Sequence, residues 1–284
     1  ALALAGCGAP VEDAVDDAGD AARAADGSDA NDVADGSDAN DVADVVDAAR
    51  DVAVDRADVA VDRADVLDAA RDVVDAGVDG AMDGGVRCAA EMTLVEGRVC
   101  VDRWEAGLVE VTLDGGVQPW SPYYTPGTRT VRAVSRPGAQ PQGYISGAQA
   151  QAACRAAGKR LCTEKEWMAA CQGSRGFVYP YGNTYVKGAC NEGRPTHPVN
   201  DCFGPGSGVF TSANMNDPCC VNLPNTLATG GSFPSCRSEA GIYDLHGSLH
   251  EWIDATTERG NGIFKGGFFV DAKLNGAGCS YRTT

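Results

Sequence analysis

The chain has 284 residues and a formal net charge of −17 at pH 7. The segment from Glu12 to Asp83 accounts for this charge. It contains 22 Asp, one Glu and five Arg, which give a local net charge of −18. Neither this segment nor the nearly neutral remainder has the basic surface that nucleic-acid binding requires, so no nucleic-acid partner is expected. The sequence has no run of about 18 apolar residues that would predict a transmembrane helix.

The first residues of the chain indicate export. Leu4-Ala5-Gly6-Cys7 resembles the bacterial lipobox, in which a Cys after small residues is lipidated and becomes the mature N-terminus. We interpret residues 1–7 as the remnant of a signal peptide and predict that Cys7 is lipidated. The alternative is a chance run of small residues around an isolated Cys. Lipidation predicts a protein at the bacterial cell envelope, facing the periplasm or the exterior, with the lipid anchor as its only membrane attachment.

Residues 8–86 are predicted to form a disordered acidic tether. The sequence GSDANDVAD starts at Gly27 and again at Gly36, and DVAVDRA starts at Asp51 and again at Asp58. An Asp at every third or fourth position repels its neighbours and leaves no continuous apolar face to bury. A coiled coil is disfavoured because Val and Asp are poor helix formers. A calcium loop is disfavoured because the bidentate Glu is missing.

Cysteines are concentrated in the second part of the chain. None lies between Cys7 and Cys88, and eleven lie from Cys88 to Cys279. This density favours disulfides and an oxidising compartment. A zinc site would need close pairs such as Cys-x-x-Cys, which do not occur, and the adjacent Cys219 and Cys220 do not easily serve one tetrahedral ion. Eleven is an odd number, and the pairing cannot be deduced from the sequence.

Residues 87–284 have the composition of a folded domain, with Trp, Tyr, Phe and Pro at regular intervals. Ser146 and Gln149 form a capping box that predicts one helix, and Thr163 and Glu166 form a second. Each predicted helix ends at a Gly. The remaining apolar pieces are short and separated by Gly, Pro and Asn, which indicates a loop-rich α+β domain held together by cross-links.

Five segments of this domain form an ordered set of motifs. They are CVDRWEA (100–106), GKRLCTEKEWMAAC (158–171), YPYGN (179–183), GIYDLHGSLHEW (241–252) and FKGGFF (264–269). In this order they resemble the formylglycine-generating enzyme family, also called sulfatase-modifying factor domains. The resemblance covers residues 88–284 and implies the irregular, C-type-lectin-like α+β architecture of that family. The family continues past the position of Thr284, so the resemblance also implies a domain truncated at its C-terminus.

The fourth motif contains the candidate metal site. The resemblance implies a calcium ion held by the side chains of Asp244 and Glu251 and by the backbone carbonyls of Gly247 and Leu249. The residue types agree with this expectation, because calcium prefers carboxylate and carbonyl oxygens on turns that Gly permits. Ser248 replaces the Asn that the family has at this position, and this departure removes none of the expected ligands.

Other interpretations of the same motif remain open. Asp244 and Glu251 would form an acid/base pair only if they converge and their pKa values are driven apart. His246 and His250 have the helical i, i+4 spacing of a zinc pair but no third ligand in order. In the purely structural alternative, Asp244 caps the turn and Glu251 pairs with a surface Arg. A second calcium site near Asn191 is not assigned.

The fifth motif bears on catalysis. Catalytic members of the family have, shortly after the Gly-Gly pair, two Cys five residues apart that bind Cu(I), a soft ion that favours thiolates. Counting from Gly267, the resemblance places these positions at Asp271 and Gly276, so neither supplies a thiolate. Cys279 resembles a structural position instead. No catalytic residue and no copper are therefore expected.

Three further groups of residues are interpreted as structural. Trp104, Trp167 and Trp252 are expected in the core. Arg160 and Glu164 are expected in a buried polar network, and Asp102, Arg103 and Glu105 are expected to anchor the first strand by ion pairing.

The sequence as a whole predicts an exported lipoprotein. It would display a non-catalytic, calcium-stabilised module that binds an unidentified protein or glycan of the envelope. The alternative is a copper- and oxygen-dependent oxidase that converts a sulfatase Cys to formylglycine.

Overall fold

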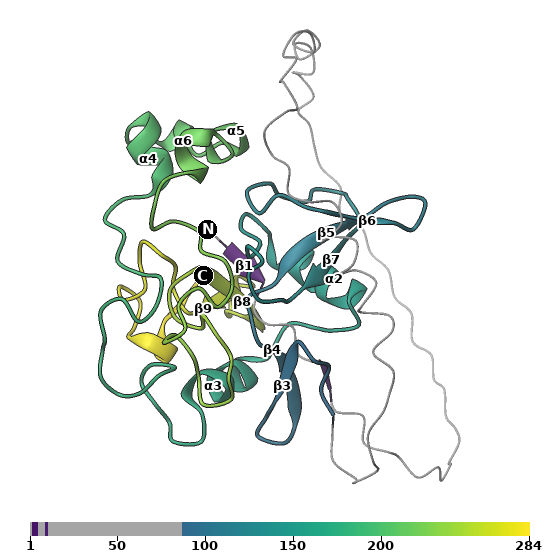
Figure 1. Cartoon of the computed structure of the whole chain (residues 1–284), viewed down its shortest axis with the longest axis vertical. Coiled ribbons are helices and arrows are strands. Elements are labelled where there is room, and N and C mark those ends of the chain that lie inside the picture. The colour runs from purple at the N-terminus through teal and green to yellow at the C-terminus, as the bar shows by residue number, and fades with distance from the viewer. Residues whose placement is uncertain (1, 5–8, 11–86) are drawn as a thin grey trace, which may run out of the picture. The chain divides into compact units, whose positions relative to one another are not determined.

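A computed structural model describes residues 2–4, 9–10 and 87–284 (Figure 1). The contacts divide the chain into two compact units, and all described residues belong to the unit made of residues 1–14 and 85–284. Cys7 and almost all of the predicted tether lie outside the described residues. No helix in the described part of the chain is both long enough and apolar enough to span a bilayer.

The strands of the described unit form three small sheets. The first has the order β1-β8-β9-β10, with β1 parallel to β8 and the other neighbours antiparallel. In this sheet β1 is Leu2–Leu4, β8 is His250–Thr256, β9 is Gly262–Lys265 and β10 is Arg282–Thr283. The second sheet has the order β2-β4-β3 and the third β6-β5-β7, both antiparallel. In the second sheet β2 is Ala9–Pro10, β4 is Val99–Asp102 and β3 is Met92–Val95. In the third sheet β6 is Val117–Pro119, β5 is Gly107–Val111 and β7 is Val131–Val134.

Both predicted helices are confirmed. They are α2 (Gly147–Ala156) and α3 (Glu164–Gln172), and each begins at a complete capping box. In α3 the C-cap is the predicted Gly173, whereas the C-cap of α2 is Ala157, one residue before the predicted Gly. The short side-chain-to-backbone bonds of a capping box satisfy helix donors locally, which explains why these helices are readable from the sequence.

A group of short helices between residues 198 and 221 was not predicted. The group consists of α4 (Pro198–Phe203), a 3₁₀ turn (Ser207–Val209), α5 (Ser212–Met215) and α6 (Pro218–Val221). Figure 1 shows the three α-helices gathered at the upper left. The Cys202–Cys219 disulfide joins α4 to α6. Each helix is too short to carry an amphipathic period, so the cross-link and local packing define this region.

The main hydrophobic core lies between α3 and strands β4, β8 and β9. Trp167 of α3 is 1% exposed and packs with Leu245, Ile253 and Ile263, which confirms its predicted place in the core. Trp104 and Trp252 are only half-buried. A second cluster joins α2 to β5 and β7. The expectation of a mixed, loop-rich domain is confirmed.

Disulfides hold these layers together, as expected. The described pairs are Cys88–Cys100, Cys171–Cys279, Cys190–Cys236 and Cys202–Cys219. Cys154 is disulfide-bonded as well. Cys162 and Cys220 are buried and form no disulfide.

Candidate functional site

The expected calcium ligands lie on one loop and the strand that follows it. Asp244, Gly247 and Leu249 belong to the loop over residues 241–249, and Glu251 lies on the buried face of β8. The motif is therefore not helical. The i, i+4 spacing of the two His, on which the zinc alternative depended, does not apply in this backbone.

The loop has a tightly constrained backbone. Asp244, Gly247 and Ser248 all have φ between 51° and 78°, the left-handed region that favours Gly. A Cβ on Gly247 would lie 2.3 Å from the carbonyl oxygen of Asn191. The Gly247 N–H donates to the carbonyl of Gly266 at 2.9 Å, and the Ser248 N–H donates to the carbonyl of Asn191 at 2.8 Å. Gly247 thus permits the close approach that holds the loop against its neighbours.

The two expected carboxylate ligands are both buried. Asp244 is 4% exposed, and its Oδ2 accepts a 2.7 Å hydrogen bond from the Gly231 N–H. Glu251 is 2% exposed, and its Oε2 accepts a hydrogen bond from the Trp167 indole N–H. Burial raises the pKa of Asp244 to about 6 and the pKa of Glu251 to about 8. The prediction that Glu251 pairs with a surface Arg in the structural alternative is wrong.

Glu105 brings a third buried carboxylate to this site. Its Oε1 accepts a 3.1 Å hydrogen bond from the Leu249 N–H, and the Ser248 hydroxyl also bonds to it. Its pKa is raised well above the usual value, first by burial and then by the charges of Glu251 and Asp244. The prediction that Glu105 forms an ion pair is therefore wrong, because this carboxylate faces other carboxylates.

No basic side chain of the described residues forms a salt bridge with these three carboxylates. Lys265 lies directly opposite Glu251 on β9, yet its ammonium lies 3.7 Å from Glu164 and over the ring of Trp167. Three acidic groups in a buried space without a basic partner need protons or a cation for compensation.

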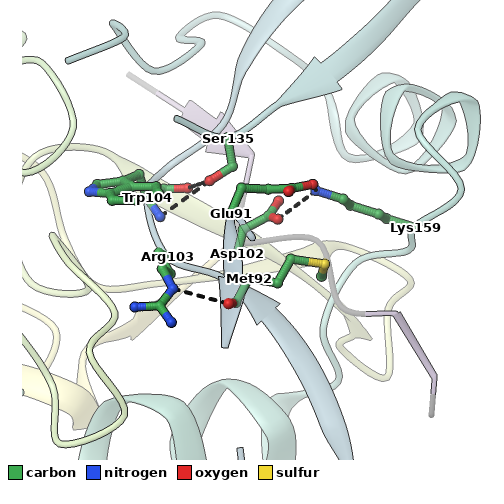
Figure 2. Close-up of polar contacts among 7 residues, drawn as sticks. All are labelled: Glu91, Met92, Asp102, Arg103, Trp104, Ser135 and Lys159. Atoms are coloured by element: carbon green, nitrogen blue, oxygen red, sulfur yellow. Dashed lines mark hydrogen bonds and ion pairs between the residues drawn. The ribbon is translucent and has the colours of Figure 1, made fainter. Parts of the chain in front are cut away.

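The first strand pair carries a separate ion network, shown in Figure 2. The Lys159 ammonium lies 2.6 Å from Asp102 and 3.3 Å from Glu91, so ion pairing by Asp102 is confirmed. Arg103 instead donates to the carbonyl of Met92 at 3.0 Å. This network neutralises Asp102 and leaves the carboxylate of Glu105, three residues further on, without a cationic partner.

The predicted Arg160 and Glu164 network also differs from the structure. Arg160 makes a bidentate pair with Glu166 at 2.6 and 2.7 Å, whereas Glu164 lies near Lys265 and Arg282. Both predicted residues are partly exposed, so neither belongs to a fully buried network.

The two His of the motif have different partners. His246 is completely buried, and its Nε2 lies 3.3 Å from a carboxylate oxygen of Glu192. His250 lies 3.1 Å from the Tyr281 hydroxyl and stacks on Phe264. Within residues 87–284 no three His, Cys, Asp or Glu side chains converge as a ready-made metal site. Where a second calcium site was left unassigned, the Asn191 side-chain amide donates a hydrogen bond to the carbonyl of Thr226.

Asp271 and Gly276 occupy a closed turn before the end of the chain. One carboxylate oxygen of Asp271 accepts from the N–H groups of Lys273 and Leu274 at 3.0 and 2.9 Å, and the other accepts from the Tyr281 hydroxyl at 3.1 Å. Gly276 has a φ of 122°, and a Cβ there would lie 2.9 Å from a backbone oxygen. Thiolates at both positions would require this turn to be rebuilt.

The remaining cysteines do not supply a Cu(I) pair either. Cys279 is disulfide-bonded to Cys171 of α3, which agrees with its interpretation as a structural residue. Cys162 and Cys220, which form no disulfide, are buried in different hydrophobic clusters. Burial raises the pKa of both thiols, so the thiolate form that a soft metal needs is disfavoured. The described residues therefore do not fit a copper centre.

This fold and this site define a sulfatase-modifying-factor-like domain. The model of the family described as "Sulfatase-modifying factor enzyme 1-like domain" matches residues 120–282, more than half of the chain. The chain belongs to this family, as its motifs indicate.

Two curated relatives are similar to half of the chain. Both are named "Inactive C-alpha-formylglycine-generating enzyme 2", one from Bos taurus and one from Mus musculus, and each is 27% identical over 145 residues. The match covers 50% of this chain and 42% and 41% of the two relatives, so it spans less than half of their length.

Sequence reasoning pointed to Asp244 and Glu251, which are both buried, but it gave no indication that the buried carboxylate of Glu105 bonds to the same loop. It also missed the bond from Trp167 to Glu251. The only sequence signal for Glu105 was its place in the first motif, CVDRWEA, which indicates importance but no partner.

Proposed function

We propose that the chain displays a non-catalytic, calcium-stabilised module of the sulfatase-modifying factor family, which binds a protein or glycan at the bacterial cell envelope. The observation that carries the non-catalytic part is the closed turn at Asp271 and Gly276, where the family's catalytic members have their paired thiols. The names of the two curated relatives describe inactive proteins, which is compatible with this proposal.

Calcium fits the donor set of the carboxylate site. Asp244 and Glu251 offer hard oxygen ligands, and the carbonyls of Gly247 and Leu249 lie on the loop that leads into β8. A bound calcium ion would neutralise buried negative charge and cross-link the loop to the strand. Such a cross-link contributes most to stability in a domain whose helices and strands are short, because the hydrophobic core of such a domain orders few of the loops.

The non-catalytic assignment predicts that the domain does not oxidise a substrate cysteine. A Cys-x-Pro-x-Arg peptide incubated with the full chain, copper and oxygen should retain its thiol, because the described residues offer no paired thiolates to hold Cu(I). Mass spectrometry of the peptide measures the outcome, with a catalytic family member as the positive control. Formylglycine above the level of a no-enzyme control would contradict the assignment.

The envelope location rests on the lipobox-like Leu4-Ala5-Gly6-Cys7 and is supported by the disulfides, which form in oxidising compartments. The precursor with Cys7→Ser should move from the membrane fraction to the soluble fraction, because the lipid has lost its attachment atom. Cys88→Ser is the matched control and should remain in the membrane fraction. Peptide mapping that finds Cys7 joined to another cysteine would overturn the lipidation, since that sulfur is then occupied.

A further inference from the structure

We propose that Arg103 and Arg237 form a binding site for a phosphate group on the surface of the domain. The site goes beyond the proposed function, which names no residue that would contact a partner, and it shares no residue with the expected calcium ligands. Its two basic side chains come from distant parts of the chain, because Arg103 follows β4 and Arg237 lies shortly before the 241–252 motif.

The backbone brings the two arginines together at Tyr243. This residue forms an antiparallel β-bridge with Arg237, and its N–H donates to the carbonyl of Arg103 at 2.8 Å. The disulfide between Cys190 and Cys236 anchors the residue just before Arg237. Both arginine side chains therefore start from fixed backbone positions next to the same residue.

The two guanidinium groups meet over Gly241. A Cβ on this residue would lie 3.1 Å from Nη2 and 3.5 Å from Nε of Arg237, and 3.7 Å from Nη1 of Arg103. Three guanidinium nitrogens from two side chains thus lie within 3.7 Å of one point. A phosphate group presents several oxygens in different directions, so one group can accept hydrogen bonds from both arginines.

Neither arginine is neutralised by a carboxylate in the part of the chain that the structure describes. No salt bridge of residues 87–284 includes Arg103 or Arg237. Arg103 donates through Nε to the carbonyl of Met92 at 3.0 Å (Figure 2), and the guanidinium of Arg237 lies 5.5 Å from the centre of the Tyr243 ring. A carbonyl and an aromatic ring carry no net charge, so two positive charges remain side by side.

The guanidinium of Arg175 has a different environment. It lies 4.2 Å from the centre of the Phe177 ring and 3.4 Å from a carboxylate oxygen of Glu239. Arg175 and Arg237 thus both lie over an aromatic ring, but of these two only Arg175 has a carboxylate partner. Because like charges repel, an anion between Arg103 and Arg237 would supply the compensation that Glu239 gives to Arg175.

The charge of the site favours phosphate. Two guanidinium groups carry a charge of +2, and a phosphate monoester carries about −1.5 to −2 at pH 7. Guanidinium groups stay charged and bind phosphate oxygens through paired N–H donors. Arg103 is half-buried and Arg237 is exposed, so a ligand can reach the site from solvent. A phosphate ester on a glycan or on a lipid head group has the required chemistry.

Isothermal titration calorimetry of the full chain tests the site. The probes are inorganic phosphate, glucose 6-phosphate and glycerol 3-phosphate, with glucose as the uncharged control. The variants are Arg103→Gln and Arg237→Gln, and Arg175→Gln is the matched control. The melting temperature of each variant verifies its folding, because Arg103→Gln also removes the bond to Met92.

Arg103→Gln and Arg237→Gln should each weaken binding of the phosphate probes about tenfold, because a charged hydrogen-bond donor is lost. Arg175→Gln should bind as the unaltered chain does. Tighter binding of glucose 6-phosphate than of glycerol 3-phosphate would support the site with a glycan as the source of the phosphate. The reverse order would support it with a lipid head group as the source, and equal affinities would support recognition of the phosphate alone.

The proposal is overturned if the unaltered chain binds none of the phosphate probes at millimolar concentration, or if both arginine variants bind them unchanged. Repetition in calcium-free buffer excludes binding through a metal ion. If phosphate binding disappears there while both arginine variants retain it in calcium, the ion holds the phosphate and the proposal is wrong. Absence of phosphate binding would leave the proposed calcium site and the non-catalytic assignment intact, because neither uses these arginines.

Discussion

Calcium is expected to raise the melting temperature of the domain, and replacement of Glu251 by Ala or Gln is expected to remove this increase. A ligand that binds only the folded state stabilises it by about 2.7 kcal/mol at a concentration of 100 times its Kd. For a domain of this size, that corresponds to an increase in melting temperature of roughly 5–10 °C. The Gln variant matters because Ala also removes the acceptor of the Trp167 indole N–H.

The increase in melting temperature should grow with pH. Burial raises the pKa of Asp244 to about 6 and that of Glu251 to about 8, above their ordinary values of 3.8 and 4.5. Without calcium, the folded state therefore holds these protons more tightly than the unfolded state. Their contribution to stability is complete below the ordinary pKa values and is lost as pH rises through about 6 and then about 8. Above this range both carboxylates are ionised, and calcium bound to them is expected to restore the lost stability.

Thermal melts in calcium and in chelator at pH 5 and pH 8 measure this dependence. At pH 5 protons compete with the metal, so the two melting curves should lie close together, whereas at pH 8 they should separate. Glu110→Gln is the matched control, because Glu110 is a carboxylate paired with Arg129 outside the site, and it should show the same separation as the unaltered chain. Superimposable curves at pH 8 would exclude a calcium ion that is bound by Asp244 and Glu251.

Removal of the Cys171–Cys279 disulfide is expected to cost more stability than removal of Cys88–Cys100, Cys190–Cys236 or Cys202–Cys219. It closes 108 positions, and chain entropy predicts a contribution of about 4.8 kcal/mol for a loop of this length. Both cysteines are fully buried in the main core, where α3 packs against the end of the chain. Double replacement with Ala should therefore also leave unfilled space.

Urea unfolding of the full chain with both cysteines replaced measures the loss in free energy of unfolding. The matched control is the double replacement of Cys88 and Cys100, which close only 12 positions and are expected to contribute about 2.8 kcal/mol. Equal losses for the two double variants would show that loop length does not determine the effect.

Local patterns in the sequence determined the features that depend on neighbouring residues. Ser146 with Gln149 and Thr163 with Glu166 located α2 and α3, because a capping box acts over four residues. The order of the five motifs identified the family, which the match to residues 120–282 confirmed. Counting from the Gly-Gly pair showed that Asp271 and Gly276 stand where catalytic members have Cys, and that Cys279 does not. Such a count needs only the sequence and no knowledge of the fold.

Only the tertiary structure decided how distant groups combine. The motif from Gly241 to Trp252 has the spacing of a helix in its His residues, yet it is a loop followed by β8, whose pairing with β9 overrides the local pattern. The disulfide partners were open in the sequence because any Cys can in principle meet any other. The fold likewise buries Glu105, Asp244 and Glu251 near one another, and no basic side chain of residues 87–284 forms a salt bridge with them. Desolvation and Coulomb repulsion depend on distances in space, and a linear pattern does not contain these distances.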